Sequence, residues 1–366
     1  MDIENFLNMV PEGYVIYICI ALLGIGFFLL AQGGGFLVNG GIGLAESLNI
    51  KTVVIGLTIL AFSTSAPELA FNIFAGIDGH GEVVLGNVFG SNVANLALVL
   101  GIGALVHNYT RKKSGLSNAK TQIPQKVLKL NRSWLRWSTW VITTVVVVAV
   151  LATVSGLPNA AYLFSWQLGL VGIVFFVIFF KRVMMAGQEE EEEEEEGKTV
   201  KEPLGFSAIR SIIYICFGML LLLAGGKMAE LGAIGIATKM GISEMFVGFT
   251  IVAIATSLPE LVTTIVACRK DEGAIAIGNI VGSNIFNLLF VLPITMVVVG
   301  FAPIELNYLK ISGIGEPLFY VLSMLTITWI ARQMMQEDKD INNKEAKLLL
   351  CIYALFLVIA GFFITT

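Results

Sequence analysis

Two glutamates, Glu68 and Glu260, lie inside strongly apolar stretches, and each directly follows a Thr-Ser-x-Pro sequence. An ionisable group in the middle of a membrane-spanning segment is costly and is by default a candidate functional group. The structural alternatives are a protonated glutamate that is hydrogen-bonded between helices, or a residue at a helix end in the membrane interface. Because the same sequence precedes both glutamates, we interpret the pair as one functional site.

The residues around the two glutamates offer hard oxygen ligands. Neither of the two histidines and none of the four cysteines falls within these motifs, which argues against zinc, copper or nickel. Six to eight oxygens in a flexible geometry suit Ca²⁺, whereas Mg²⁺ prefers a tight octahedron that keeps its waters. Na⁺ is similar in size to Ca²⁺ and accepts the same oxygens. The candidate hydroxyl and amide ligands are Thr64, Ser65, Thr256, Ser257, Asn95 and Asn287.

The charge of such a site favours exchange over passive flow. Two ionised carboxylates would give an empty site a charge of about −2 in surroundings of low dielectric constant, where isolated charges are very unfavourable. One Ca²⁺ or at least two Na⁺ would neutralise this charge. A carrier that changes sides only when loaded with either ion is an antiporter.

Both motifs belong to an internal repeat with an offset of 192 residues. Residues 54–100 align on residues 246–292 without a gap, and 21 of the 47 positions are identical. The identical positions include Thr-Ser, Pro-Glu and Gly-Ser-Asn, which shared hydrophobicity alone would not bring into register. We infer that the chain arose by duplication.

The composition favours a membrane protein. Hydrophobic residues make up 56% of the 366 residues and charged residues 14%, whereas soluble domains are about a quarter charged. No basic face suggests nucleic-acid binding, and no obligatory protein partner is evident, so the lipid bilayer is the expected surrounding. A spanning helix needs about 20 apolar residues. Ten segments qualify, near residues 14–38, 51–77, 82–106, 137–155, 160–180, 207–229, 243–268, 273–299, 314–332 and 346–365.

Five helices in each half imply an inverted-topology repeat. Because five is odd, the second half must enter the membrane from the opposite side, as in many secondary transporters. Pro67 and Pro259 cannot donate a backbone hydrogen bond and clash with the preceding turn. We therefore predict an all-α membrane protein with ten transmembrane helices, in which helices 2 and 7 are broken and carbonyls near Thr64 and Thr256 are freed.

The predicted domains and orientation follow from the loops. The first repeat covers residues 1–180, a cytoplasmic acidic linker residues 181–204, and the second repeat residues 205–366. With both termini outside, 20 of the 23 basic residues fall on the cytoplasmic side. This agrees with the positive-inside rule, by which cytoplasmic loops carry an excess of Lys and Arg. The run Glu189 to Glu196 is expected to be a disordered, solvated part of this linker. Residues 1–13 lack Lys and Arg, so the first apolar segment is expected to be a retained helix rather than a signal peptide.

The third and eighth helices carry a second shared pattern. Glycines at four-residue spacing would let these helices approach the broken ones closely; they are Gly86, Gly90, Gly278 and Gly282. Two polar pairs, each four residues apart, lie on one helical face. These side chains could point at the ion site or bond between helices; they are Ser91 with Asn95, and Ser283 with Asn287.

Four sequence motifs resemble the cation/calcium exchanger superfamily, and most closely its prokaryotic sodium/calcium exchangers. They are GLTILAFSTSAPE and GNVFGSNVAN in the first half, and VGFTIVAIATSLPE and GNIVGSNIFN in the second. They cover about a quarter of the chain and occur twice at matching positions. The resemblance implies that Ca²⁺ is held by Glu68 and Glu260, with the backbone carbonyls of Thr64 and Thr256.

The resemblance also implies sodium sites on both sides of the calcium site. Besides the glutamates and threonines, these sodium sites would use the carbonyls of Ala61 and Ala253. They would also use the hydroxyls of Ser91 and Ser283. Ser65 and Ser257 match site positions of the family, and Asn95 and Asn287 match a central position that varies among members. Some members, including potassium-dependent ones, have Asp where this chain has Asn287, which argues against coupling to potassium.

We therefore expect a secondary active antiporter that exchanges Na⁺ for Ca²⁺ by alternating access in a prokaryotic plasma (inner) membrane. The main alternative is an H⁺/Ca²⁺ antiporter of the same fold, and a passive cation channel is less favoured. The hydroxyl-rich ligand set favours sodium, because protons need no such cage. We expect no enzymatic activity and no cofactor, since Ca²⁺ and Na⁺ are the transported substrates.

Overall fold

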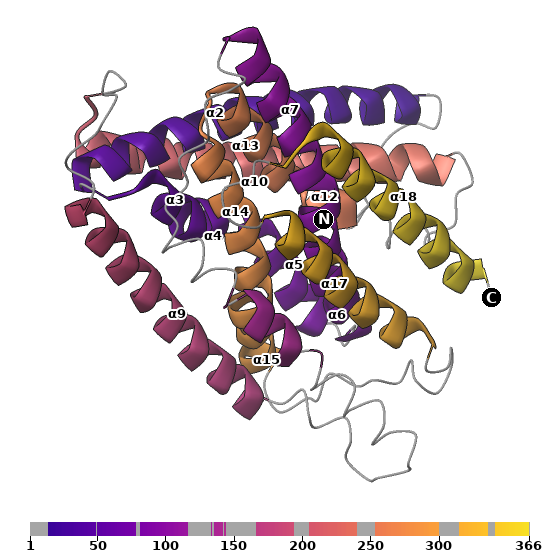
Figure 1. Ribbon diagram of the computed structural model, residues 1–366. Coiled ribbons are helices and arrows are strands. Elements are labelled where there is room, and N and C mark those ends of the chain that lie inside the picture. The colour runs from indigo at the N-terminus through magenta and orange to yellow at the C-terminus, as the bar shows by residue number, and fades with distance from the viewer. Residues whose placement is uncertain are drawn as a thin grey trace.

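The computed structural model describes eleven stretches of the chain, and in them every regular element is a helix (Figure 1). The described residues are 14–48, 50–77, 81–115, 133, 135–141, 143, 166–193, 205–239, 253–299, 315–335 and 341–365. Most of the predicted span 137–155 and the start of the predicted span 243–268 lie outside them.

Two long helices, α2 (Val15–Leu48) and α10 (Ala208–Lys239), pack along each other (Figure 1). The 34 residues of α2 span roughly 51 Å at 1.5 Å per residue. This exceeds the hydrocarbon core of about 30 Å, so an untilted α2 would extend beyond the core. The predicted segments 14–38 and 207–229 were both too short, because the helices continue beyond their most apolar part.

Glycines spaced seven residues apart bring α2 and α10 into backbone contact. A Cβ atom on Gly26 would lie 2.7 Å from the carbonyl oxygen of Gly225, and one on Gly33 would lie 2.9 Å from that of Gly218. The contacts run in opposite directions along the two helices, so the helices are antiparallel. Because Gly218 and Gly225 follow Gly26 and Gly33 by 192 residues, the repeat extends to these two helices.

The second predicted span forms a bent helix. It comprises α3 (Thr52–Ile55), the π-helix η2 (Gly56–Leu60), α4 (Ala61–Thr64) and, after a bend of 41°, α5 (Ala66–Ile77). The break predicted at the Thr-Ser-x-Pro sequence is therefore present, and it is centred on Ser65. Pro67 lacks an N–H, so the carbonyl of Ser63 has no donor at the usual position four residues later.

The equivalent break in the second half separates α12 (Ala253–Thr256) from α13 (Leu258–Arg269) at Ser257. The backbone of Ser257 has φ −87° and ψ 3°, and that of Ser65 has φ −86° and ψ 4°. This region of backbone space is sparsely populated and recurs at functional sites. The two copies of the motif thus bend the chain in the same way.

Two further helical spans form the centre of the molecule. The first joins α6 (Gly81–Ala94), η3 (Asn95–Val99) and α7 (Leu100–Lys113); the second joins α14 (Gly273–Phe286), η6 (Asn287–Val291) and α15 (Leu292–Val299). In their most apolar windows 78% and 83% of residues are buried, against 17–28% for α2, α9 and α10. The central spans therefore pack against protein, whereas the outer helices present their apolar side chains to lipid.

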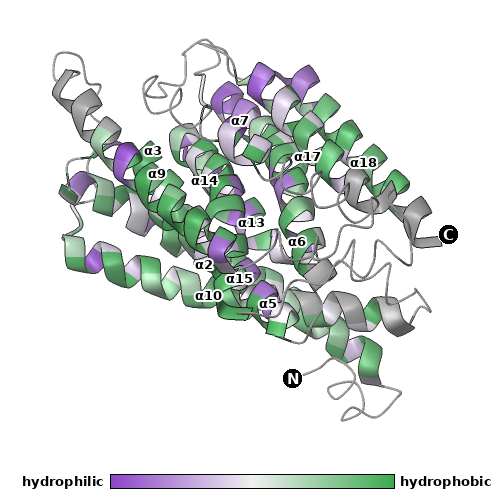
Figure 2. Cartoon of the chain, turned by 90° about the horizontal axis from the view of Figure 1, so that it is seen from below, coloured by the Kyte–Doolittle hydropathy of each residue, from purple (hydrophilic) through white to green (hydrophobic). Residues whose placement is uncertain are grey.

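The remaining helices are α9 (Trp166–Glu193), α17 (Gly315–Met334) and α18 (Asn343–Thr365). Helix α9 continues past the predicted end at residue 180 and includes the first glutamates of the acidic run, up to Glu193. The predicted linker 181–204 therefore begins with a continuation of α9, since Ala, Met and Glu are good helix formers. Hydrophilic residues gather near the end of α7 (Figure 2).

The helices identify an integral membrane protein. Among the described residues, five helices are long and apolar enough to cross a membrane, or six if the bent pair around Ser65 forms one span. The full set of ten spans stays a prediction, because several of the predicted segments are described only in part.

Candidate ion site

The two breaks place Glu68 and Glu260 together in the interior. Each lies in the first turn of the helix that follows its break, Glu68 in α5 and Glu260 in α13. Their exposed fractions are 1% and 0%, and Ser65, three residues before Glu68, forms a hydrogen bond with Glu260. The structure thus unites the two glutamates that the sequence singled out.

The carboxyl oxygens of this pair are largely without hydrogen-bond donors. Ser65 Oγ donates to Oε1 of Glu260 over 3.2 Å. Both oxygens of Glu68 and Oε2 of Glu260 have no hydrogen-bond partner in the part of the chain that the structure describes. A buried carboxylate is very unfavourable unless it is paired with a cation or hydrogen-bonded. The chemistry of the pair therefore fits a bound cation.

Thr64 extends the site toward the second repeat. Its Oγ1 donates to Oδ1 of Asn279 over 3.2 Å and lies 3.3 Å from Oγ of Ser283. Both partners belong to α14, and the hydroxyl groups of Thr64 and Ser283 also interact with the carboxyl group of Glu260. Three predicted site residues, Thr64, Ser65 and Ser283, thus lie around the carboxyl group of Glu260.

Thr256 makes the equivalent contact in the opposite direction. Its Oγ1 lies 3.3 Å from Oδ1 of Asn87 on α6 and donates to it. Ser91 Oγ donates to the same oxygen over 3.4 Å. The amides of Asn87 and Asn279 thus accept a hydrogen bond from one threonine each, and both of these bonds join one repeat to the other. The bond from Ser91 to Asn87 lies within α6.

Asn95 and Asn287 each begin a π-helical segment, η3 and η6. Both side chains are buried. Asn287 Nδ2 donates to Oδ1 of Asn92 over 3.3 Å, whereas its own Oδ1, and both polar atoms of the Asn95 amide, have no partner among the described residues. For Asn287 the structure thus shows an interhelical bond and also leaves an oxygen for a ligand. Short π-helical segments are frequent at functional sites.

The remaining predicted ligands are Ala61, Ser257 and Ala253. The carbonyl of Ala61 accepts a 3.3 Å bond from Thr64 Oγ1 and a 3.0 Å bond from the N–H of Ser65. Ser257 Oγ is buried without a hydrogen-bond partner in the described part of the chain. Ala253 begins α12, one turn before Ser257.

Three polar residues near the site escaped the sequence analysis. Asn72 is buried four residues after Glu68, and its Oδ1 accepts a 3.2 Å bond from Nδ2 of Asn87. Thr263 and Thr264 are buried on α13, and their hydroxyls have no partner among the described residues. Thr264 follows Asn72 by 192 residues. Polar residues one turn after a buried glutamate share its helical face, and this spacing could have revealed them.

Glycines of α14 allow the close approach that the site requires. A Cβ atom on Gly278 would lie 2.7 Å from the carbonyl oxygen of Val53, and one on Gly282 would lie 2.8 Å from that of Leu57. The predicted close contact between the eighth helix and the first broken helix is confirmed for these glycines. For Gly86 and Gly90 the corresponding partners would precede residue 253, outside the described residues.

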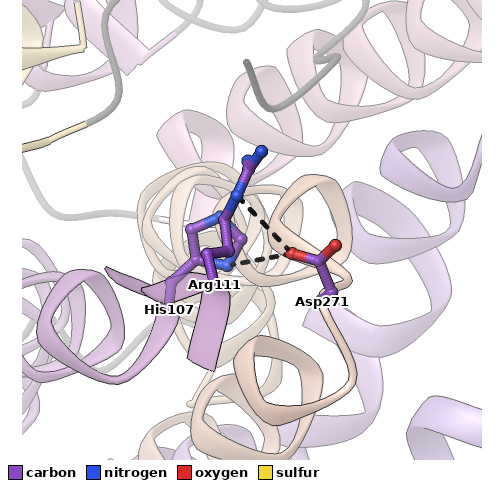
Figure 3. A network of polar contacts seen from close by, with 3 residues as sticks. All are labelled: His107, Arg111 and Asp271. Atoms are coloured by element: carbon purple, nitrogen blue, oxygen red, sulfur yellow. Dashed lines mark ion pairs between the residues drawn. The ribbon is translucent and has the colours of Figure 1, made fainter. Parts of the chain in front are cut away.

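A separate polar cluster fixes the turn between α13 and α14 (Figure 3). Asp271 Oδ1 lies 3.9 Å from Nδ1 of His107 and 4.0 Å from Nε of Arg111, both on α7. Asp271 has a positive φ of 58°, a conformation that Asp tolerates better than most residues. The cluster lies at the ends of these helices and anchors the turn that joins the helices of Glu260 and Ser283.

Comparisons with known proteins agree with this geometry. The profile of a family described as sodium/calcium exchanger protein matches residues 18–184 and 210–362. The sodium/calcium exchanger MaX1 of Methanosarcina acetivorans is 28% identical over 92% of this chain and 97% of its own length. Inner membrane protein YrbG of Escherichia coli is 28% identical over 74% of this chain and 77% of its own length.

A solved structure shares the fold. The sodium-calcium exchanger NCX_Mj, soaked with Na⁺ and Sr²⁺, superposes with a TM-score of 0.67 and 24% sequence identity. The superposition covers 94% of this chain and 98% of the other. The helical arrangement described above is therefore that of a known membrane protein.

Proposed function

Because the chain belongs to the sodium/calcium exchanger protein family, we propose that it exchanges Na⁺ for Ca²⁺ across a prokaryotic inner membrane by alternating access. The family consists of transporters, and the chain is a cation/Ca²⁺ antiporter of that family. Sodium as the coupling ion and the inner membrane as the location are the specific parts of the proposal. The names of MaX1 and YrbG support them.

The observation that carries the proposal is the buried pair of carboxyl groups. When both are ionised, Glu68 and Glu260 would repel each other in the protein interior, and three of their four oxygens have no hydrogen-bond partner among the described residues. One Ca²⁺ or two or more Na⁺ would remove this repulsion and supply the missing partners. The empty carrier would retain a charge of about −2 in a medium of low dielectric constant, which opposes its return without an ion.

The ligand assignments follow the resemblance of the two motifs to the cation/calcium exchanger superfamily. We assign Ca²⁺ to the carboxyl groups of Glu68 and Glu260, with the carbonyls of Thr64 and Thr256. Sodium would use the neutral oxygens on both sides, which are the hydroxyls and carbonyls of the two breaks and of α6 and α14. The remaining assigned residues are Ser65, Ser257, Ser91, Ser283, Asn95, Asn287, Ala61 and Ala253.

The abundance of neutral oxygens favours Na⁺ over H⁺ as the coupling ion. The hydroxyls of Thr64, Ser65 and Ser283 lie around the carboxyl group of Glu260. A proton would need only the carboxylate itself, whereas Na⁺ needs several oxygens at once. A carrier that exchanges protons for Ca²⁺ would need these oxygens for Ca²⁺ alone, whereas a sodium-coupled carrier uses them for both ions.

We also propose that the chain is an inverted repeat of two five-helix halves, with both termini outside and the acidic linker in the cytoplasm. The antiparallel packing of α2 against α10, which are equivalent by the 192-residue offset, supports this arrangement. The equal backbone angles of Ser65 and Ser257 support it as well. An inverted repeat offers two similar conformations that open to opposite sides, which alternating access requires.

Uptake of radiolabelled Ca²⁺ into proteoliposomes with imposed ion gradients tests the proposal. We expect an outward Na⁺ gradient to drive uptake, and proton or potassium gradients of the same size to have no effect. Uptake driven by a proton gradient in sodium-free buffer would instead establish the H⁺/Ca²⁺ alternative. Flux without any counter-ion would establish a channel.

A further inference from the structure

A cationic cavity is lined by residues other than those of the ion site. It has a volume of about 290 Å³ and lies between the helical residues 135–141 and α17. Its lining combines two arginines, two tryptophans and three threonines with one leucine.

The two arginines give the cavity a net positive charge. Arg136 and Arg332 both line it, and neither forms an ion pair with a carboxylate within the residues that the structure describes. Two like charges that share a cavity repel each other, so an anion between them would be stabilising. Guanidinium groups bind the oxygens of phosphate in a bidentate manner.

A buried hydroxyl gives the cavity a second polar feature. The side chain of Thr328 is only 5% exposed, and its Oγ1 has no hydrogen-bond partner in the described part of the chain. A buried hydroxyl without a partner is unfavourable. Because Thr328 lines the cavity, a ligand oxygen there would complete its hydrogen bonding.

The surroundings place the cavity at the edge of a bilayer. Trp140 and Trp329 line it and are 56% and 61% exposed, and Leu322 on the same helix as Trp329 is 53% exposed. Tryptophans gather where the hydrocarbon core meets the headgroups. Arg332 lies in the last turn of α17. This combination of arginine, tryptophan and exposed apolar surface is typical of the membrane interface, where lipid phosphates lie.

We propose that this cavity binds the phosphate of an anionic phospholipid headgroup. Basic pockets between helices near the cytoplasmic face have the charge and depth that such headgroups require. A volume of about 290 Å³ is at the lower end of small-ligand pockets, and it suits a headgroup without its chains. The acidic run around Glu189 to Glu193 is the competing occupant, but it carries no apolar part to match Trp140 and Trp329.

The test measures lipid binding to the purified, delipidated full chain by native mass spectrometry, with phosphatidylglycerol as the probe. In the double variant Arg136→Gln/Arg332→Gln we expect binding to weaken at least about tenfold, because bonds to charged groups are lost. The matched control is Lys344→Gln/Lys347→Gln, which removes the same charge from exposed lysines at the start of α18. We expect it to stay within about twofold of the wild type, since exposed charges contribute little.

Further arms identify the ligand. Phosphatidylcholine should bind more weakly than phosphatidylglycerol, and inorganic phosphate at millimolar concentration should not displace the lipid. Displacement by phosphate would show a site for a soluble anion and overturn the lipid assignment. Deletion of Glu189 to Glu196 should leave lipid affinity unchanged. A rise in affinity that depends on Arg136 and Arg332 would show that the acidic run occupies the cavity instead.

Two milder variants cover the case in which the glutamine pair does not fold. Arg136→Lys/Arg332→Lys keeps the charge but loses bidentate bonding, and Thr328→Val removes the buried hydroxyl at constant shape. Each should lower the affinity for phosphatidylglycerol severalfold at an unchanged melting temperature. Binding equal to the wild type in both, or an equal loss in the lysine control, would overturn the proposal.

Discussion

The hydroxyl of Ser65 donates a 3.2 Å hydrogen bond to Oε1 of Glu260, and the two residues come from opposite halves of the repeat. Its counterpart Ser257 has a buried hydroxyl without a partner, and Glu68 has no hydrogen-bond partner on either oxygen, among the described residues. Two copies of one motif thus form two unequal half-sites. Glu260 is held by its neighbours, whereas both oxygens of Glu68 are available to a ligand.

We predict that Ser65→Ala lowers the apparent affinity for Ca²⁺ by about tenfold, because a hydrogen bond to a charged group is lost. Ser63→Ala is the matched control. The hydroxyl of Ser63 donates to the carbonyl of Ile59 in its own helix over 2.7 Å, so its removal should leave affinity nearly unchanged. The measurement is the Ca²⁺ dependence of sodium-driven uptake. Equal effects of the two variants would argue against a role of Ser65 at the site.

We predict that Gly282→Ala destabilises the protein, whereas Gly24→Ala does not. The added methyl at Gly282 would lie 2.7 Å from Cβ of Ala61 and 2.8 Å from the carbonyl oxygen of Leu57. A methyl added at Gly24 would have no atom within 4 Å. Overpacking of this kind costs about 1–3 kcal/mol. Thermal unfolding in detergent should show a lower melting temperature only for Gly282→Ala. An unchanged melting temperature would mean that α14 and the first broken helix are less closely packed.

We predict that potassium is neither required nor transported. The central position holds Asn287, a neutral amide whose Nδ2 donates to Asn92, where potassium-dependent members of the superfamily have an acidic residue. Exchange should proceed at the same rate in potassium-free buffer, and labelled Rb⁺ should not enter with Ca²⁺. A stall without potassium that is reversed by its addition would refute this prediction.

We predict that deletion of Glu189 to Glu196 leaves basal exchange nearly intact. Helix α9 carries the start of this run beyond its most apolar part, Trp166–Met185. Charges in solvent are screened beyond about 8–10 Å at physiological salt, so they should hardly change the field at Glu68 or Glu260. The measurement is sodium-driven uptake at saturating ions. A correctly inserted but inactive deletion variant would show that the run takes part in transport.

The sequence predicts the parts of the fold that depend on local chemistry. Pro67 and Pro259 place the two breaks because proline lacks an N–H, and the bend at Ser65 is present. Gly278 and Gly282 indicate close helix contact because only glycine leaves room for it. The pairing of Glu68 with Glu260 is expected because both glutamates follow the same Thr-Ser-x-Pro sequence.

Other features depend on tertiary packing, which local sequence does not encode. The π-helical segments at Asn95 and Asn287 have no propensity signal that separates them from ordinary helix. The contact of Gly26 with Gly225 lies outside the 47 aligned positions, although the 192-residue offset would have extended to it. Asn72 was overlooked because its repeat counterpart is a threonine and the two do not match in identity.

The central claim is that Glu68 and Glu260 together carry the exchanged ions, and the most direct test is sodium-driven uptake of radiolabelled Ca²⁺ by purified Glu68→Gln and Glu260→Gln in proteoliposomes. Each substitution removes one negative charge at nearly constant shape, so the site would hold about −1 and could no longer balance Ca²⁺. The control is Glu46→Gln, which changes an exposed glutamate on α2. We predict uptake at background for both site variants, with wild-type insertion and melting temperature, and full uptake for the control. Substantial uptake by either site variant would contradict the two-carboxylate site.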